Sequence, residues 1–100
     1  MDKYYIVAKI HPKAGMEDQL QTRIQANIPL VRQESGCLRY DLHKSRSDNT
    51  FTFYEIWADK ASFEAHVNTA PHMKQYRADT KDMVEKPSDI TILSAVDLLD

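Results

Sequence analysis

The residues best suited to chemistry lie in one stretch, residues 53–76, where His66 and His72 stand among large aromatic rings. An imidazole titrates near neutral pH, and a proton-transfer catalyst works best when its pKa lies near the working pH. His66 is therefore the candidate general base. The alternative is a surface histidine that only hydrogen-bonds a backbone carbonyl.

Four further side chains of this stretch are candidates for substrate binding. Trp57 and Tyr54 offer rings that can stack on a planar molecule, but they fall on opposite faces of a strand, so only one can line a given cavity. His72 follows Pro71 at the start of a helix, where the positive end of the helix dipole disfavours an imidazolium. Tyr76 lies four residues further along the same helical face. Core packing for the strand aromatics, and a capping or surface role for His72, are the competing interpretations.

The hydrophobic pattern around these residues predicts alternating strands and helices. Its period changes from two residues to about 3.6 at Asp59, a good helix N-cap. The predicted strands are residues 4–11, 37–45, 50–57 and 90–98. The first predicted helix begins at Met16, has its apolar positions up to Val31 and is stopped by Gly36; two more follow, from Asp59 through His66 and from Pro71 onward. Two right-handed βαβ crossovers with a hairpin between them predict an α+β fold, a ferredoxin-like βαββαβ sandwich.

Two of the predicted strands are apolar on both faces. In residues 50–57, Phe51, Phe53 and Trp57 fall on one face and Tyr54 and Ile56 on the other, and residues 90–98 repeat the pattern. A sheet that is apolar on both faces needs a cover on each. The helices supply one cover, and we expect the sheet of a second subunit to supply the other, so a homodimer is predicted.

Composition argues against several other classes of protein. The formal net charge of −2 and the scattered basic residues disfavour nucleic-acid binding, and no segment approaches the roughly 20 apolar residues that span a bilayer. Cys37 is the single cysteine, and the apolar run after Met1 is too short for a signal peptide, so a cytoplasmic location is expected. The four histidines lack metal-ligand spacing, and two glycines cannot build a phosphate-binding loop, so neither a metal nor a nucleotide or flavin cofactor is expected.

Several motifs together resemble the antibiotic biosynthesis monooxygenase family, and among its branches the small quinol monooxygenases. The resemblance rests on Tyr54-Glu55-Ile56-Trp57, Phe63, His66, Thr69-Ala70-Pro71-His72-Met73-Lys74-Gln75-Tyr76 and, upstream, Glu34-Ser35-Gly36-Cys37-Leu38-Arg39-Tyr40. It extends from Tyr5 to about Val96, which implies a single domain of this kind over residues 1–100. It also implies that two sheets pack face to face into a dimeric α+β barrel, with a pocket in each protomer.

The resemblance implies a cofactor-independent monooxygenase that oxidises a quinol or hydroxylated aromatic with O2. Such an enzyme needs an apolar cavity, a base that removes a phenolic proton, and room for O2, because the substrate itself supplies the electrons. The heme-degrading relatives use an Asn, a Trp and a His at positions that align here with Ala8, His66 and Tyr76. None of the three matches, so heme degradation is disfavoured.

Two other functions stay open at the level of sequence. The resemblance extends to an isomerase of a phosphorylated dione related to autoinducer-2, and the chain could also be a non-catalytic dimeric binding module. A phosphate needs Lys or Arg within hydrogen-bond reach, so a cavity without such a cation favours the oxygenase. A cavity filled by its own side chains favours the binding module.

Overall fold

The predicted order of elements is confirmed by the computed structural model, which describes residues 2–99. The second crossover contains two short helices. The elements are β1 (Tyr4–Pro12), α1 (Glu17–Arg32), β2 (Cys37–Lys44), β3 (Phe51–Trp57), α2 (Lys60–Asn68), α3 (Pro71–Thr80) and β4 (Val84–Leu93).

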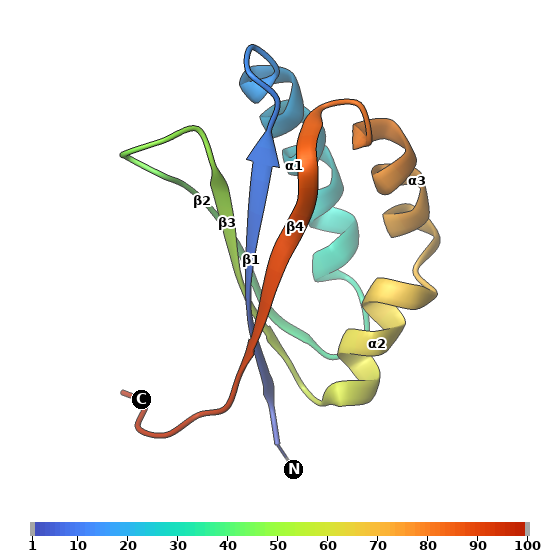
Figure 1. Cartoon of the computed structure of the whole chain (residues 1–100). Coiled ribbons are helices and arrows are strands. Elements are labelled where there is room, and N and C mark those ends of the chain that lie inside the picture. Colours follow the sequence, from blue (N-terminus) through green and yellow to red (C-terminus); the bar gives the residue numbers. More distant parts are fainter. Residues whose placement is uncertain (1, 100) are drawn as a thin grey trace.

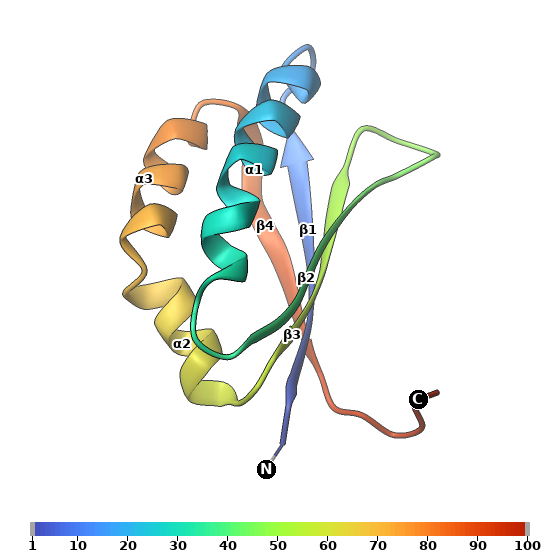
Figure 2. The same ribbon diagram turned by 180° about the vertical axis from the view of Figure 1, so that it is seen from behind.

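The strands form one antiparallel sheet in the order β2-β3-β1-β4. The crossover from β1 through α1 to β2 leaves room for β3, and the crossover through α2 and α3 returns the chain to β4 on the far side of β1. All three helices lie on one face of the sheet, and the other face is open (Figures 1 and 2). This is the predicted ferredoxin-like α+β arrangement.

The helix-covered face is built from strict alternation along β3. Phe51, Phe53, Glu55 and Trp57 are buried, while the residues between them are half-buried on the opposite face. The predicted N-cap is confirmed, since the Asp59 carboxylate accepts a hydrogen bond of 2.8 Å from the backbone amide of Ser62. The cap fixes the point at which the chain leaves β3 and turns back as α2 over the sheet.

The open face of the sheet is largely apolar near its centre. Register places Tyr5 opposite Ile56 and Val7 opposite Tyr54 in the β1–β3 pair, and Leu93 opposite Tyr5 in the β1–β4 pair. These side chains alternate with the buried residues of the same strands and remain partly exposed. Tyr54 and Ile56, which the sequence placed on the second apolar face of their strand, therefore lie on this open surface.

The predicted last strand, residues 90–98, was wrong in its bounds. β4 runs over Val84–Leu93, and Val96, Leu98 and Leu99 lie exposed beyond it. Proline removes a ladder donor and is normally confined to edge strands or bulges, and Pro87 lies inside β4. Here β4 is an edge strand and its register with β1 shifts between Lys9 and His11, which accommodates the proline.

The predicted role of Gly36 was also wrong, because α1 already ends at Arg32. Gly36 has φ +83°, a conformation that side-chain-bearing residues rarely adopt, and a Cβ placed there would overlap the side chain of Ser62 in α2. Glycine at this position lets the loop after α1 pass directly against α2. This close approach helps to build the candidate active site, because the same loop carries Glu34.

Candidate active site

A cavity of about 400 Å³ opens between the sheet and the pair of helices α2 and α3. Its inner wall is mainly apolar and includes Ile6, Phe53, Phe63 and Met73. The polar groups that reach it are few, as in most small-molecule pockets. Three titratable residues of its wall are buried, namely Tyr40, Glu55 and His66.

His66 lies in the last turn of α2 and is only 4% exposed. Its ring stacks on that of Trp57, with 4.6 Å between ring centroids. It is roughly perpendicular to the ring of Tyr40, with 5.7 Å between ring centroids. Burial lowers the pKa of His66 below its usual value, although the hydrogen bond to Glu34 opposes the shift. The imidazole is therefore neutral at neutral pH, as a base must be.

Glu34 anchors His66 through one ring nitrogen. A Glu34 oxygen, Oε2, lies 2.9 Å from His66 Nδ1, and the carboxylate has only acceptor atoms, so Nδ1 carries the proton. This tautomer leaves the lone pair on Nε2, for which no hydrogen-bond partner occurs among residues 2–99. His66 thus presents a free basic nitrogen on a ring whose orientation is fixed.

The same carboxylate also holds the second histidine. His72 Nε2 lies 2.6 Å from Glu34 Oε2, and the Glu34 side chain is only 12% exposed. His72, at the start of α3, and His66, at the end of α2, therefore meet on one residue of the α1–β2 loop. Gly36 lets that loop lie close against α2, and this brings the three side chains together.

Glu55 is the second titratable group in the cavity wall. It is 4% exposed, and Trp57 Nε1 donates a hydrogen bond of 2.9 Å to its Oε1. Burial raises its pKa to about 7, with the Trp57 bond opposing and the Glu34 charge adding to the shift. Across the strand pair stands Tyr40, buried and stacked on Phe53, and burial raises its pKa well above the usual value.

The residues predicted for substrate binding fall into three groups. Tyr76 lines the cavity, and burial raises its pKa to about 12, so it is a neutral hydroxyl. Trp57 and His72 do not line it, but they contact the base, by stacking and through Glu34. Tyr54 lies on the open face of the sheet and forms no part of this cavity.

Sequence reasoning missed Glu34, Glu55 and Tyr40 as members of the site. A signal for Glu55 was present, because it occupies an inward position of β3 between Phe53 and Trp57, where a carboxylate is unusual. Nothing in the sequence pairs Glu34 with two histidines 32 and 38 residues away.

The remaining histidines take no part in this site. His11 pairs with Asp89 at 2.8 Å, and His43 lies near the backbone oxygen of Thr52. Within residues 2–99, no three His, Cys, Asp or Glu side chains are grouped to hold a metal ion. Over the same residues, no helix has both the length and the apolar character to cross a bilayer.

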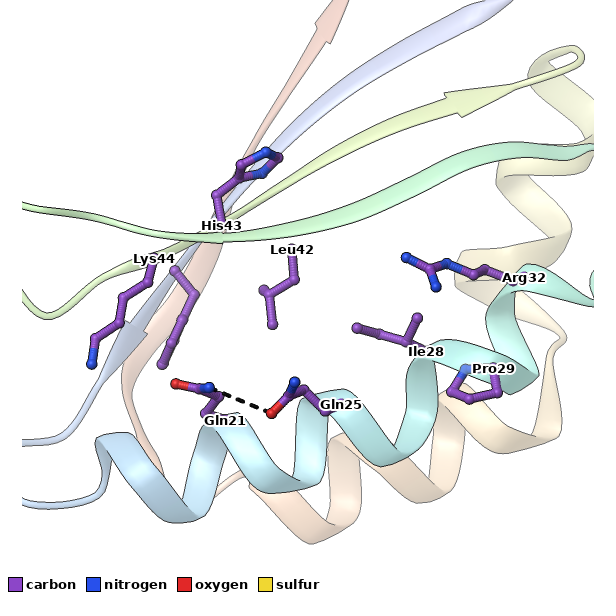
Figure 3. A pocket seen from close by; sticks show the side chains of 9 residues that line it. Gln21, Gln25, Ile28, Pro29, Arg32, Leu42, His43 and Lys44 are labelled. Atoms are coloured by element: carbon purple, nitrogen blue, oxygen red, sulfur yellow. Dashed lines mark hydrogen bonds between the residues drawn. The ribbon is translucent and has the colours of Figure 1, made fainter.

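A second hollow, of about 440 Å³, lies between α1 and the strands β2 and β3. Its walls carry Gln21, Gln25 and Lys44, and Figure 3 shows the two glutamines joined by a hydrogen bond while the His43 ring points away from the helix. We call it the polar groove, and the first hollow the His66 cavity. The polar groove contains no buried titratable group.

Comparison with known proteins agrees with the geometry. The family model described as "Antibiotic biosynthesis monooxygenase" matches residues 3–79. A Bacillus subtilis protein named "Putative monooxygenase YcnE" is 31% identical over 83% of this chain and 87% of its own length. A Mycobacterium tuberculosis protein, "Putative monooxygenase Rv0793", is 26% identical over 92% of this chain and 90% of its own.

Solved structures show the same fold. The structure of Rv0793 superposes with a TM-score of 0.88 at 24% identity, covering 98% of this chain and 99% of that one. The structure of PA3566 from Pseudomonas aeruginosa gives 0.88 at 28% identity, covering 97% of each chain. The chain therefore belongs to the antibiotic biosynthesis monooxygenase family.

Proposed function

We propose that this protein is a cofactor-independent monooxygenase that oxidises a quinol or hydroxylated aromatic with O2, and that His66 is its general base. The observation that carries the proposal is a neutral imidazole, fixed by Glu34 through Nδ1, in the wall of an apolar cavity. The family and the names of the relatives support a monooxygenase-like function; the substrate class and the cofactor-free mechanism are the proposal.

The chemistry follows from the base. His66 Nε2 removes a proton from a ring hydroxyl, and the resulting anion is electron-rich enough to react with O2. The Glu34 carboxylate stabilises the imidazolium that forms, as the acidic partner of a catalytic histidine does. Apolar walls exclude water from the anion and leave space for O2.

A second candidate, isomerisation of a small phosphorylated dione, has one observation in its favour. Arg77, Lys81 and Lys86 contribute to the cavity wall, and none of them forms an ion pair within residues 2–99. All three residues are exposed, however. Lys86 of β4 lies opposite His11 of β1, whereas His66 stacks on Trp57 at the other end of the sheet, so Lys86 lies away from the base. Arg77 is nearer, because its charge contributes to the lowered pKa of His66.

The third reading, a non-catalytic binding module, has less support. In a non-catalytic binding module we expect the protein's own side chains to fill the cavity, whereas about 400 Å³ of it is unfilled. That volume falls within the range of ordinary small-molecule sites.

We also propose that the protein acts as a homodimer through the open face of the sheet. Tyr5, Val7, Tyr54, Ile56 and Leu93 form a partly exposed apolar surface there. A patch of this kind is a recognised mark of association. Sedimentation at micromolar concentration is expected to give twice the monomer mass. A measured mass equal to that of the monomer would contradict the proposed dimeric barrel. The cytoplasmic location remains a prediction from the sequence.

Oxygen uptake tests the function directly. Reduced quinones and hydroxylated aromatics are screened with an oxygen electrode, and each turnover is expected to consume one O2. Uptake by His66→Ala should fall about 10²- to 10⁴-fold, the usual contribution of a positioned acid or base. His43→Ala, an exposed histidine outside the cavity, is the matched control and should leave uptake unchanged.

Chelators should leave the rate unaltered, and activity should fall at pH values low enough to protonate the imidazole. Unchanged uptake in His66→Ala moves the role of base to His72. Uptake that occurs only after heme or flavin is added removes the cofactor-free mechanism. Turnover of a phosphorylated dione without O2 consumption supports the isomerase instead.

A further inference from the structure

We propose that Glu55 is a second catalytic residue of the His66 cavity, which binds a hydroxyl of the substrate and later donates a proton to the oxygen atom that leaves. The inference rests on the proposed function and deepens it. It assigns the cavity to a ring that carries a hydroxyl facing β3.

The two oxygens of Glu55 differ in their surroundings. Oε1 accepts the hydrogen bond from Trp57 Nε1 at 2.9 Å, which fixes the plane and direction of the carboxyl group. No hydrogen bond to Oε2 occurs within residues 2–99, and Oε2 is not among the fully buried polar atoms that lack a partner. Since Glu55 lines the cavity, its unpartnered oxygen is available to a ligand there.

Glu55 and His66 are held by the same indole. Trp57 donates to Glu55 through its ring nitrogen and stacks on His66 with its face. Tyr40, paired with Glu55 across the strands, contacts His66 edge-on. The two titratable groups are therefore neighbours on rigid elements, α2 and β3, which is the arrangement that proton transfer to one bound ring requires.

A purely structural role does not account for a carboxyl group at this position. A glutamine has the same length and its carbonyl would accept the Trp57 hydrogen bond without the cost of burying an ionisable group. The sequence instead places glutamate at a position that is 4% exposed. Burial raises the pKa of Glu55 to about 7, so both its forms are populated at neutral pH, which suits a group that alternately accepts and donates a proton.

Ionisable groups of several other elements lie around Glu55. The charges of Glu34 in the α1–β2 loop and of Cys37 and Tyr40 in β2 interact with that of Glu55. The other ionisable groups that line the cavity are His66 of α2, Tyr76 and Arg77 of α3, Lys81 and Lys86. Burial raises the pKa of the Cys37 thiol to about 11 and that of Tyr76 to about 12, so both are neutral near pH 7. Burial keeps Tyr40 neutral in the same way, and the negative charge of Glu34 adds to the rise in the pKa of Glu55.

The reaction balances with these two groups alone. His66 takes the proton of one ring hydroxyl, and a ring carbon of the anion forms a bond to O2; the peroxide then takes that proton from His66. His66 next removes the hydrogen of that carbon as a proton. The C–H electron pair becomes the second bond of a new carbonyl, and the O–O bond breaks.

The departing oxygen leaves as hydroxide and receives the proton of Glu55, which forms water. The imidazolium then returns a proton to Glu55. Quinol and O2 thus give hydroxyquinone and water, with four electrons passing from the ring to O2 and no external reductant.

The test compares Glu55→Gln with the wild-type protein by three measurements. With a reduced quinone that the wild type oxidises, kcat should fall about 10²-fold while KM changes less than threefold. Trp57 is the only tryptophan, so its fluorescence reports both the fold and the titration of Glu55. A fluorescence step near pH 7 is expected in the wild type and should be absent from the variant.

Binding of 1-naphthol, followed by quenching of Trp57, provides a readout that needs no turnover. In a His66→Ala background, binding should tighten about fivefold from pH 5.5 to pH 8.5, because the carboxylate accepts the naphthol proton more strongly than the acid does. The further change Glu55→Gln should abolish this dependence.

Each outcome decides the assignment. Wild-type kcat in a folded Glu55→Gln protein overturns it, and so does naphthol binding that is independent of pH in the His66→Ala background. If the wild type oxidises no hydroxylated aromatic, the proposed function fails, and the naphthol titration still supports or overturns Glu55 as the hydroxyl-binding group. If Glu55→Gln does not fold, the titration of naphthol binding to proteins that retain Glu55 gives the decision.

Discussion

The His66 cavity and the polar groove have nearly the same volume, about 400 and 440 Å³, and lie on the same face of the same sheet. They differ in the groups their walls bury. The cavity buries Glu55 and His66, at 4% exposure each, and an atom of each has no hydrogen-bond partner among the described residues 2–99. The wall of the groove carries polar side chains such as the half-buried Gln21 and the exposed Lys44 (Figure 3).

Two hollows of similar volume can therefore differ in the chemistry that their walls support. Burying an ionisable group costs free energy, and a chain that keeps two of them beside a cavity receives no stability in return. Solvated polar groups in a groove cost nothing and are expected on any surface. Buried titratable groups that retain an atom without a hydrogen-bond partner therefore mark the site. The experiments below test this distinction between the two hollows.

After replacement of His66 itself, the largest effect is expected from the carboxylate that connects the two histidines. Glu34→Gln keeps the size of the side chain. Its amide can accept from or donate to the His66 ring, so it pairs with either tautomer, and it carries no charge that stabilises an imidazolium. We expect kcat to fall about 10²- to 10³-fold. The acidic limb of the pH–rate profile should move to lower pH, since the hydrogen bond that His66 donates to Glu34 raises the pKa of His66.

Lys44→Gln, in the wall of the polar groove, is the matched control and should leave both quantities unchanged. An equal loss of activity in the two variants would mean that both hollows serve the reaction. Wild-type kcat in Glu34→Gln would remove the carboxylate from the mechanism.

The second prediction uses the two glycines, both with positive φ, as a matched pair. Gly15→Ala has no neighbouring atom to displace and should lower the free energy of unfolding by about 1 kcal/mol for backbone strain alone. Gly36→Ala also overlaps Ser62, and should cost about 2 to 4 kcal/mol. Denaturant titrations give both values.

Gly36→Ala should also reduce kcat at temperatures where the protein remains folded, because the loop that carries Glu34 is pushed away from α2. Gly15→Ala should not. Equal stability losses would show that the contact with Ser62 is not tight, and that the site does not depend on it.

The third prediction concerns stability as a function of pH. Burial raises the pKa of Glu55 from 4.5 to about 7, so the folded protein retains this proton over a range in which the unfolded chain has lost it. Folding is thus progressively disfavoured as the pH rises from 4.5 to 7, by up to about 3 kcal/mol, and no further above that. Thermal melts of the wild type minus those of Glu55→Gln isolate this contribution.

Below pH 4.5 the two proteins should differ little, and at pH 8 the Glu55→Gln protein should be the more stable. A difference that does not vary with pH would show that Glu55 is already ionised in the folded state at pH 5. The cavity would then lose the feature that separates it most clearly from the groove.

The fold was predictable from local patterns, and the site only in part. Alternation along β3 and the cap at Asp59 depend on neighbours in sequence, and both are confirmed. His66 was recognisable by its residue type and its motif. Its partner Glu34 was not, because a contact over 32 residues is created by the packing of α2 on the α1–β2 loop.

The errors have the same origin. The bounds of β4 were missed because this edge strand is almost entirely exposed, so no alternating apolar pattern marks its first half. Tyr54 was recognised as an aromatic of the right kind, but which face of a strand the helices cover is decided by the whole sheet. Glu55 was overlooked because the inward positions of β3 were assumed to be apolar.

The smallest effect is expected in the polar groove. Gln21 Nε2 donates to Gln25 Oε1 over 3.4 Å, a long hydrogen bond between exposed side chains one helical turn apart. Such a pair stabilises a helix by at most about 0.5 kcal/mol, and alanine, the better helix former, offsets part of its loss. Gln21→Ala should therefore change the free energy of unfolding by less than about 0.5 kcal/mol and leave kcat and KM as they are. An unchanged Tm with a tenfold rise in KM would place the substrate in the groove, against a wall without any buried base, and the distinction between the two hollows would no longer hold.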